Sequence, residues 1–210
     1  MLRSSALLTI LFALLLICSC ANPADDKPKA VTTEAAPVSA ASPAAQGEKY
    51  SITPENSKIE FVASKVTGSH HGSFGKFSGA IDFNGQTQTS QVTINIDMAS
   101  VTTDTPDLTK HLQTADFFDV AKFPQAVFTS TEIKPTGDKG APYNVTGNLQ
   151  LHGVTKAITF PAAIVVTPDA VTVESTFAIN RKDFGINYAG AADNLIRDEV
   201  LLTLHVRGVK

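Results

Sequence analysis

The sequence predicts an all-β fold, an antiparallel sheet interrupted by one short helical insertion. Apolar and polar residues alternate along several segments, as in residues 92–98, which is typical of strands with one buried face. Turn-forming sequences separate these segments, among them Asn84-Gly85 and Thr167-Pro168-Asp169. Helical spacing is confined to residues 105–120. Many short strands joined by regular turns form either a sandwich or a barrel.

The N-terminus, residues 1–19, has the pattern of a signal peptide. Arg3 supplies a positive charge, an apolar run extends from Ala6 to Ile17, and small residues follow. A membrane-spanning helix needs about 20 predominantly apolar residues, and this run is shorter and is followed by polar, Pro-rich sequence. We therefore expect the segment to be cleaved and the rest of the chain to be exported.

Cys20 is the predicted site of lipidation. Ile17-Cys18-Ser19-Cys20 resembles a bacterial lipobox, and the alternative is ordinary signal cleavage beside two incidental cysteines. The resemblance implies several acyl chains on Cys20, palmitate among them, and two chains already give stable anchoring. Ala21 follows the cysteine, which by similarity to Gram-negative sorting rules favours the outer membrane. We expect a lipoprotein anchored to the outer membrane and facing the periplasm.

Composition excludes several classes of function. The chain has two cysteines, Cys18 and Cys20, which leaves the folded part without a redox dithiol, a thiolate metal site or a cysteine nucleophile. A net charge of −3 with dispersed basic residues argues against a nucleic-acid partner.

Residues 20–47 are predicted to be a lipidated N-terminus followed by a disordered tether. The segment consists mainly of Ala, Pro, Ser and Thr with a few charges, and it carries too little apolar surface to offset the entropy cost of ordering. The folded domain is expected to span residues 48–210.

Within this domain, five segments alternate with a period of two and predict half-buried antiparallel strands. Their apolar positions are Ile59-Phe61-Ala63, Val92-Ile94-Ile96-Met98, Val145-Gly147-Leu149-Leu151, Val171-Val173-Ser175-Phe177-Ile179 and Val200-Leu202-Leu204-Val206. Between the second and third of them, Leu108, His111 and Leu112 share one face of a short helix that Thr105 or Asp107 can cap.

The histidines offer a weak case for a metal site. His70 and His71 are adjacent, so on a strand they point to opposite faces. A metal-dependent enzyme would have to gather His71, His111 or His205 from distant segments, whereas metal ligands usually cluster. The sequence also lacks the Gly-x-Ser-x-Gly and Gly-Lys-Ser/Thr motifs of hydrolases and phosphate loops. We expect no catalytic residue, metal or cofactor.

Phenylalanine is the residue type that suggests a binding site. The chain has 12 Phe, 3 Tyr and no Trp, and purely apolar rings suit a cavity for an apolar ligand. Each single Phe is more simply explained as core. A barrel of about eight strands can be filled by side chains or can hold a small ligand. His111 and Arg181 are the polar candidates beside such a cavity, although Arg181 is more simply an ion-paired lock for its loop.

The same residues resemble the YceI-like family of exported lipid-binding proteins. The matching stretches are Gly72–Gly79, His111-Leu112 with Asp116–Val120, Lys122–Phe128, Gly147–Lys156, Phe177–Ile186 and Asp198–Val200. The resemblance implies a lipocalin-like antiparallel β-barrel of about eight strands that holds an isoprenoid-type or other amphiphilic chain without catalysis. One departure is Leu108-Thr109, where many members carry Arg-Asp. The implied ligand-binding residues are Phe74, Phe77, His111, Phe117, Phe118, Phe123, Phe128, Arg181 and Phe184.

The sequence thus predicts a membrane-anchored lipoprotein whose barrel binds or carries a polyisoprenoid or quinone-like molecule. The alternative is a ligand-free structural or stress-response module that interacts with a protein partner. A strand edge near Val200–Val206 would allow a homodimer unless the barrel closes over it.

Overall fold

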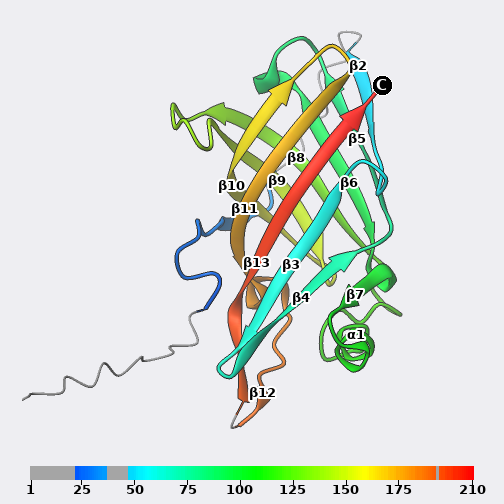
Figure 1. The fold of residues 1–210 in the computed structure, drawn as a ribbon, viewed down its shortest axis with the longest axis vertical. Coiled ribbons are helices and arrows are strands. Elements are labelled where there is room, and N and C mark those ends of the chain that lie inside the picture. The colour runs from blue at the N-terminus through cyan, green and yellow to red at the C-terminus, as the bar shows by residue number, and fades with distance from the viewer. Residues whose placement is uncertain (1–21, 37–46, 193) are drawn as a thin grey trace, which may run out of the picture.

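The computed structural model describes residues 22–36, 47–192 and 194–210, which form a barrel with one short helix (Figure 1). Eight strands close into a ring, since each pairs with the next and the last pairs with the first. In ring order they are β2 (Glu48–Ile52), β5 (Phe77–Phe83), β6 (Gln91–Asp97), β8 (Gln125–Pro135), β9 (Tyr143–Leu151), β10 (Val154–Val166), β11 (Ala170–Asn180) and β13 (Asn194–Val209). All these pairings are antiparallel, as predicted.

Three more strands extend the sheet at the lower end of Figure 1, where β3 pairs with β13, β4 with β3 and β7 with β4. They are β3 (Lys58–Lys65), β4 (Gly68–Phe74) and β7 (Val101–Thr103). The helix α1 (Pro106–Leu112) follows β7, inside the predicted insertion. Besides β1, which is described below, the remaining short elements are η1 (Thr87–Thr89), η2 (Met98–Ser100), η3 (Arg181–Phe184) and β12 (Gly190–Ala191), which pairs with β13.

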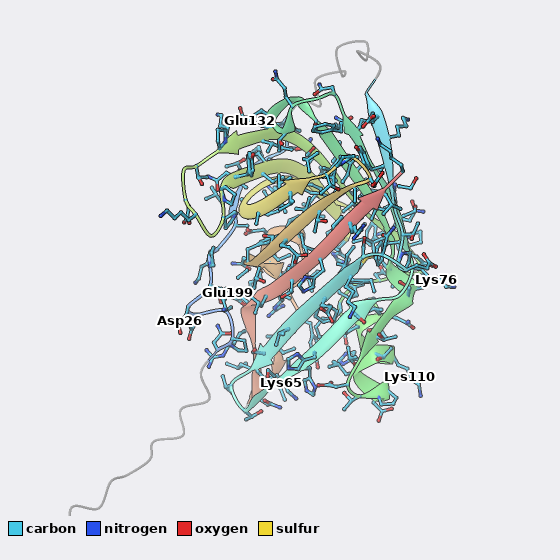
Figure 2. All side chains as sticks on the ribbon, turned by 45° about the horizontal axis from the view of Figure 1, so that its top comes forward. Asp26, Lys65, Lys76, Lys110, Glu132 and Glu199 are labelled. Atoms are coloured by element: carbon cyan, nitrogen blue, oxygen red, sulfur yellow. The ribbon has the colours of Figure 1, made fainter. Side chains whose placement is uncertain are left out.

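The interior of the barrel is packed with apolar side chains from alternate strand positions. Phe160 and Phe177 lie stacked with their ring centroids 4.2 Å apart, next to Ile158 and Ile179. Tyr50, Ile81 and Phe77 belong to a second buried cluster. Charged side chains such as Lys65, Lys76 and Glu132 lie on the outside (Figure 2).

The N-terminal segment departs from the predicted disordered tether, because residues 22–36 are folded against the barrel. The strand β1 (Val31–Glu34) pairs with residues 156–159 of β10, and the backbone of residues 28–30 bonds to Ala178. We call residues 28–34 the N-terminal strap. The prediction was wrong for this stretch because strand pairing uses backbone groups, which a segment poor in apolar side chains also has.

The predicted signal peptide and Cys20 lie outside the described residues, as do residues 37–46 of the predicted tether. In the described ranges, no helix has the length and apolar character needed to cross a membrane.

The strand edge considered for a homodimer does not exist. β13 is hydrogen-bonded to β11 on one side and to β3 and β2 on the other, so its residues 200–206 are already paired. Closure of the barrel has removed the edge.

Candidate functional site: an apolar cavity inside the barrel

The barrel contains a cavity of about 190 Å³ whose lining comes mainly from β3, β4 and six of the eight ring strands, all except β2 and β5. Its wall is made of hydrocarbon and thioether side chains, and Arg181 is the one polar residue in the described lining. The apolar lining residues are Ile59, Phe61, Ala63, Phe74, Val92, Ile94, Ile96, Met98, Leu112, Phe117, Phe118, Ala126, Phe128, Ile133, Val145, Leu149, Leu151, Ile158, Phe160, Ile164, Val173, Phe177, Ile179, Ile186, Ile196, Val200, Leu202, Leu204 and Val206. Such a space suits an apolar ligand and offers it few polar partners.

Five of the nine residues implied by the family resemblance line this cavity. They are Phe74, Phe117, Phe118, Phe128 and Arg181. Phe117 and Phe118 come from the loop after α1, where the N–H of Phe118 donates to the carbonyl of Leu112 at 3.0 Å. The ring of Phe118 lies 6.1 Å from that of Phe74 between centroids. The helical insertion therefore supplies part of the cavity wall.

Two of the other four residues lie near the cavity without lining it. Phe77 faces the interior and packs with Tyr50 and Ile81, because the break at residues 75 and 76 resets the alternation between β4 and β5. His111 was predicted to face inward, but its side chain is 38% exposed and lies 2.8 Å from Asp116 Oδ2. Its ring packs edge-on against Phe117 and Tyr188. His111 thus packs on the outer side of the helical insertion and does not line the cavity.

The last two, Phe123 and Phe184, hold the turn between β9 and β10. His152 and Gly153 form this two-residue turn with φ of 51° and 76°, as in a type I′ hairpin. The Phe123 ring packs on His152 with centroids 4.8 Å apart, and a Cβ on Gly153 would lie 2.4 Å from Cε1 of Phe123. His152 Nδ1 lies 3.2 Å from the carbonyl oxygen of Phe184. Phe123 and Phe184 thus support the turn and do not line the cavity.

Arg181 lies at the cavity wall but its guanidinium is committed to the protein. Nη1 donates to the carbonyl of Ile186 at 2.6 Å and Nε to that of Arg197 at 3.1 Å. Nη2 lies 3.4 Å from both the Ile196 carbonyl and Asp198 Oδ1. Burial lowers the pKa of Arg181 below its usual value, and the charge of Asp198 opposes that shift. The geometry matches the predicted loop lock, with Asp198 as its partner.

Three aromatic lining residues were missed as site candidates: Phe61, Phe160 and Phe177. Phe61 and Phe177 stand at apolar positions of strands whose alternation was recognised. The signal that could have found Phe61 and Phe177 is this alternation, because it assigns a side chain to the inner face regardless of motif.

Three of the five histidines, His70, His111 and His205, contact carboxylates and not one another. His70 Nδ1 lies 2.9 Å from Asp104 Oδ1, and this hydrogen bond is the main cause that lowers the pKa of Asp104. His205 pairs with Glu174 on the outside of the sheet. Within the described ranges, no three His, Cys, Asp or Glu side chains come together in a way that could hold a metal ion.

The fold and site define a class: a closed antiparallel barrel with an apolar internal cavity, the lipocalin-like architecture. Residues 50–207 match the model of the YceI-like domain, and the chain belongs to that family.

Comparison with individual proteins agrees with this assignment. Protein YceI of Salmonella newport is 37% identical over 148 residues, 67% of this chain and 74% of that protein. A UPF0312 protein of Pseudomonas putida is 35% identical over 147 residues, 67% and 73% of the two chains. BcnA of Burkholderia cenocepacia has a similar structure, with a TM-score of 0.66 and 26% identity over 74% of this chain and 98% of that one. A polyisoprenoid-binding domain of Saccharophagus degradans has a TM-score of 0.61 at 18% identity, over 77% and 99%.

Proposed function

We propose that this protein binds one apolar or amphiphilic chain, of polyisoprenoid or quinone-like type, in its barrel cavity and performs no catalysis on it. The apolar cavity carries the proposal. An empty apolar cavity costs about 24 cal/mol per Å³, so a volume of about 190 Å³ represents on the order of 4–5 kcal/mol. A hydrocarbon chain that fills the space would recover this free energy and bury its own surface at about 25 cal/mol per Å².

The hydrogen bonds of Arg181, the one polar residue in the described cavity lining, favour an apolar ligand. The donors of Arg181 are directed to three carbonyls and to Asp198. A polar ligand group inside the cavity would therefore lose its water without gaining a partner, which costs several kcal/mol. A polyisoprenoid is also what the domain from Saccharophagus degradans is described as binding, which favours this ligand class for a barrel of the same fold.

Lipid retained by the purified protein tests the proposal. Native mass spectrometry of the chain from residue 20 onward, with Cys20→Ser, should show a stoichiometric added mass that organic extraction removes. The extract should contain a long apolar chain. Protein that carries no added mass, and takes up none when incubated with a long-chain isoprenoid alcohol, would point instead to the ligand-free structural module.

We also propose that the chain is exported and anchored to the outer membrane through acyl chains on Cys20. The support is the signal-like sequence of residues 1–19 and the lipobox resemblance. Cells grown with an alkyne analogue of palmitate should label the wild-type protein in the membrane fraction. Cys20→Ala should abolish the label and release the protein into the soluble fraction; equal labelling of both proteins would contradict the anchor.

A further inference from the structure

The wall of the barrel has a gap between β10 and β11. These two strands pair only where residues 163–166 meet residues 171–174. Before residue 163, β10 pairs with β9, and after residue 174, β11 pairs with β13. The two strands have no backbone pairing with each other there, and Ser175 Oγ donates to the Pro161 carbonyl at 2.5 Å where they begin to diverge. Ile158 and Phe177, on the two sides of the gap, both line the cavity. The gap therefore lies over the cavity wall, where the rings of Phe160 on β10 and Phe177 on β11 are stacked.

The N-terminal strap occupies this gap. On one side, Val31–Glu34 pairs antiparallel with residues 156–159 of β10. On the other side, the N–H of Ala30 donates to the carbonyl of Ala178 and the N–H of Ala178 donates to the carbonyl of Pro28, both at 2.8 Å. The Ala30 side chain packs against the core cluster that contains Phe177. In Figure 1 the blue segment lies along this side of the barrel.

The strap buries little side-chain surface against the barrel. Val31 is 62% exposed, and Ala30 is the one strap side chain that packs on a core cluster in the described structure. Two ion pairs fix its ends, Lys29 with Glu199 at 2.8 Å and Glu34 with Lys156 at 2.5 Å. Such exposed pairs contribute little each. The family match covers residues 50–207, so the strap lies outside the matched domain.

We propose that the gap between β10 and β11 is a strand-binding site, that the N-terminal strap is its occupant, and that release of the strap opens a side entrance to the cavity. The inference rests on the proposed ligand-binding function and identifies how that site is reached. Cys20 lies two residues before Asn22, a distance of about 7 Å at most for extended chain. An acylated Cys20 would thus keep the entrance close to the membrane that supplies an apolar ligand.

A reversible disulfide tests the proposal. Val31 and Thr159 lie opposite each other in the β1–β10 pair, and Cys20→Ser leaves Val31→Cys and Thr159→Cys as the only thiols in the chain from residue 20 onward. We expect the oxidised variant to take up and release N-phenyl-1-naphthylamine at least tenfold more slowly than its reduced form, with an equilibrium affinity within twofold. The matched control, Thr176→Cys with Thr203→Cys, bridges β11 and β13, which are continuously paired there, and should leave the rates unchanged.

Charge reversal tests the same proposal without a disulfide. Lys29→Glu would place two carboxylates together at the start of the strap, and exchange should become several-fold faster. Adding Glu199→Lys should restore the wild-type rate. Equal rates for the oxidised and reduced forms would overturn the side entrance while leaving ligand binding intact. A protein that binds the probe in no form would overturn the proposed function itself.

Discussion

Replacing Arg181 with methionine is expected to lower the free energy of unfolding by about 3–5 kcal/mol. The side chain is 5% exposed, and its donors satisfy the carbonyls of Ile186, Ile196 and Arg197. Methionine fills much of the same volume but donates no hydrogen bond to these carbonyls, and a buried acceptor that is left unsatisfied costs about 1–3 kcal/mol. Since a domain of this kind is stable by about 5–15 kcal/mol, urea unfolding should show the loss clearly.

Lys182→Met is the matched control for this substitution. Lys182 is the next residue and also contacts Asp198, at 2.9 Å, but its side chain is 47% exposed. Removing such a surface ion pair should change stability by about 1 kcal/mol or less.

Lipid binding by Arg181→Met is a separate measurement. Under conditions where this variant remains folded, it should retain lipid as the wild type does. A variant of unchanged stability that has lost its lipid would show instead that Arg181 orients a ligand headgroup.

The cavity lining was largely predictable from alternation along the strands. All four apolar positions in residues 92–98 line the cavity, and so do Val200, Leu202, Leu204 and Val206. A strand with one buried face leaves little freedom in where its side chains point, so the periodicity alone decides the inner face.

Choosing site residues by motif was less accurate, because a motif also marks positions needed for folding. The Phe123 ring lies so close to Gly153 that a side chain there would clash with it, and the His152 ring contacts the carbonyl oxygen of Phe184. These residues are distant in sequence and meet only once β9, β10 and η3 are assembled. The sequence contains no local sign that these residues support a turn of the barrel, whereas Phe123 and Phe184 were predicted to contact the ligand.

The strap could not be predicted from its composition. A segment is predicted to be disordered when its own apolar side chains cannot bury enough surface to offset the entropy lost on ordering. Here the partners are the unpaired backbone groups of β10 and β11, which exist only because those strands diverge. The small side chain of Ala30 packs against the core there, and an alanine in a Pro- and Ala-rich segment gives no signal of this.

Filling the cavity is expected to reduce lipid binding at least tenfold. Ala126 on β8 is 3% exposed and lines the cavity, so Ala126→Phe would place a ring in a volume of about 190 Å³. The ligand and the ring would compete for the same space. In delipidated protein the substitution should not lower stability, because it fills an empty volume that costs about 24 cal/mol per Å³.

Gln125→Phe supplies the control, since Gln125 is the preceding residue on β8 and is exposed. It adds the same ring outside the barrel and should leave the retained lipid, measured by native mass spectrometry, unchanged. If the core were solid, Ala126→Phe should instead lower the free energy of unfolding, because overpacking costs about 1–3 kcal/mol. A destabilised Ala126→Phe that still binds lipid normally would therefore place the ligand somewhere other than this cavity. Stability and lipid content measured on the same two variants thus separate an open binding site from a filled barrel.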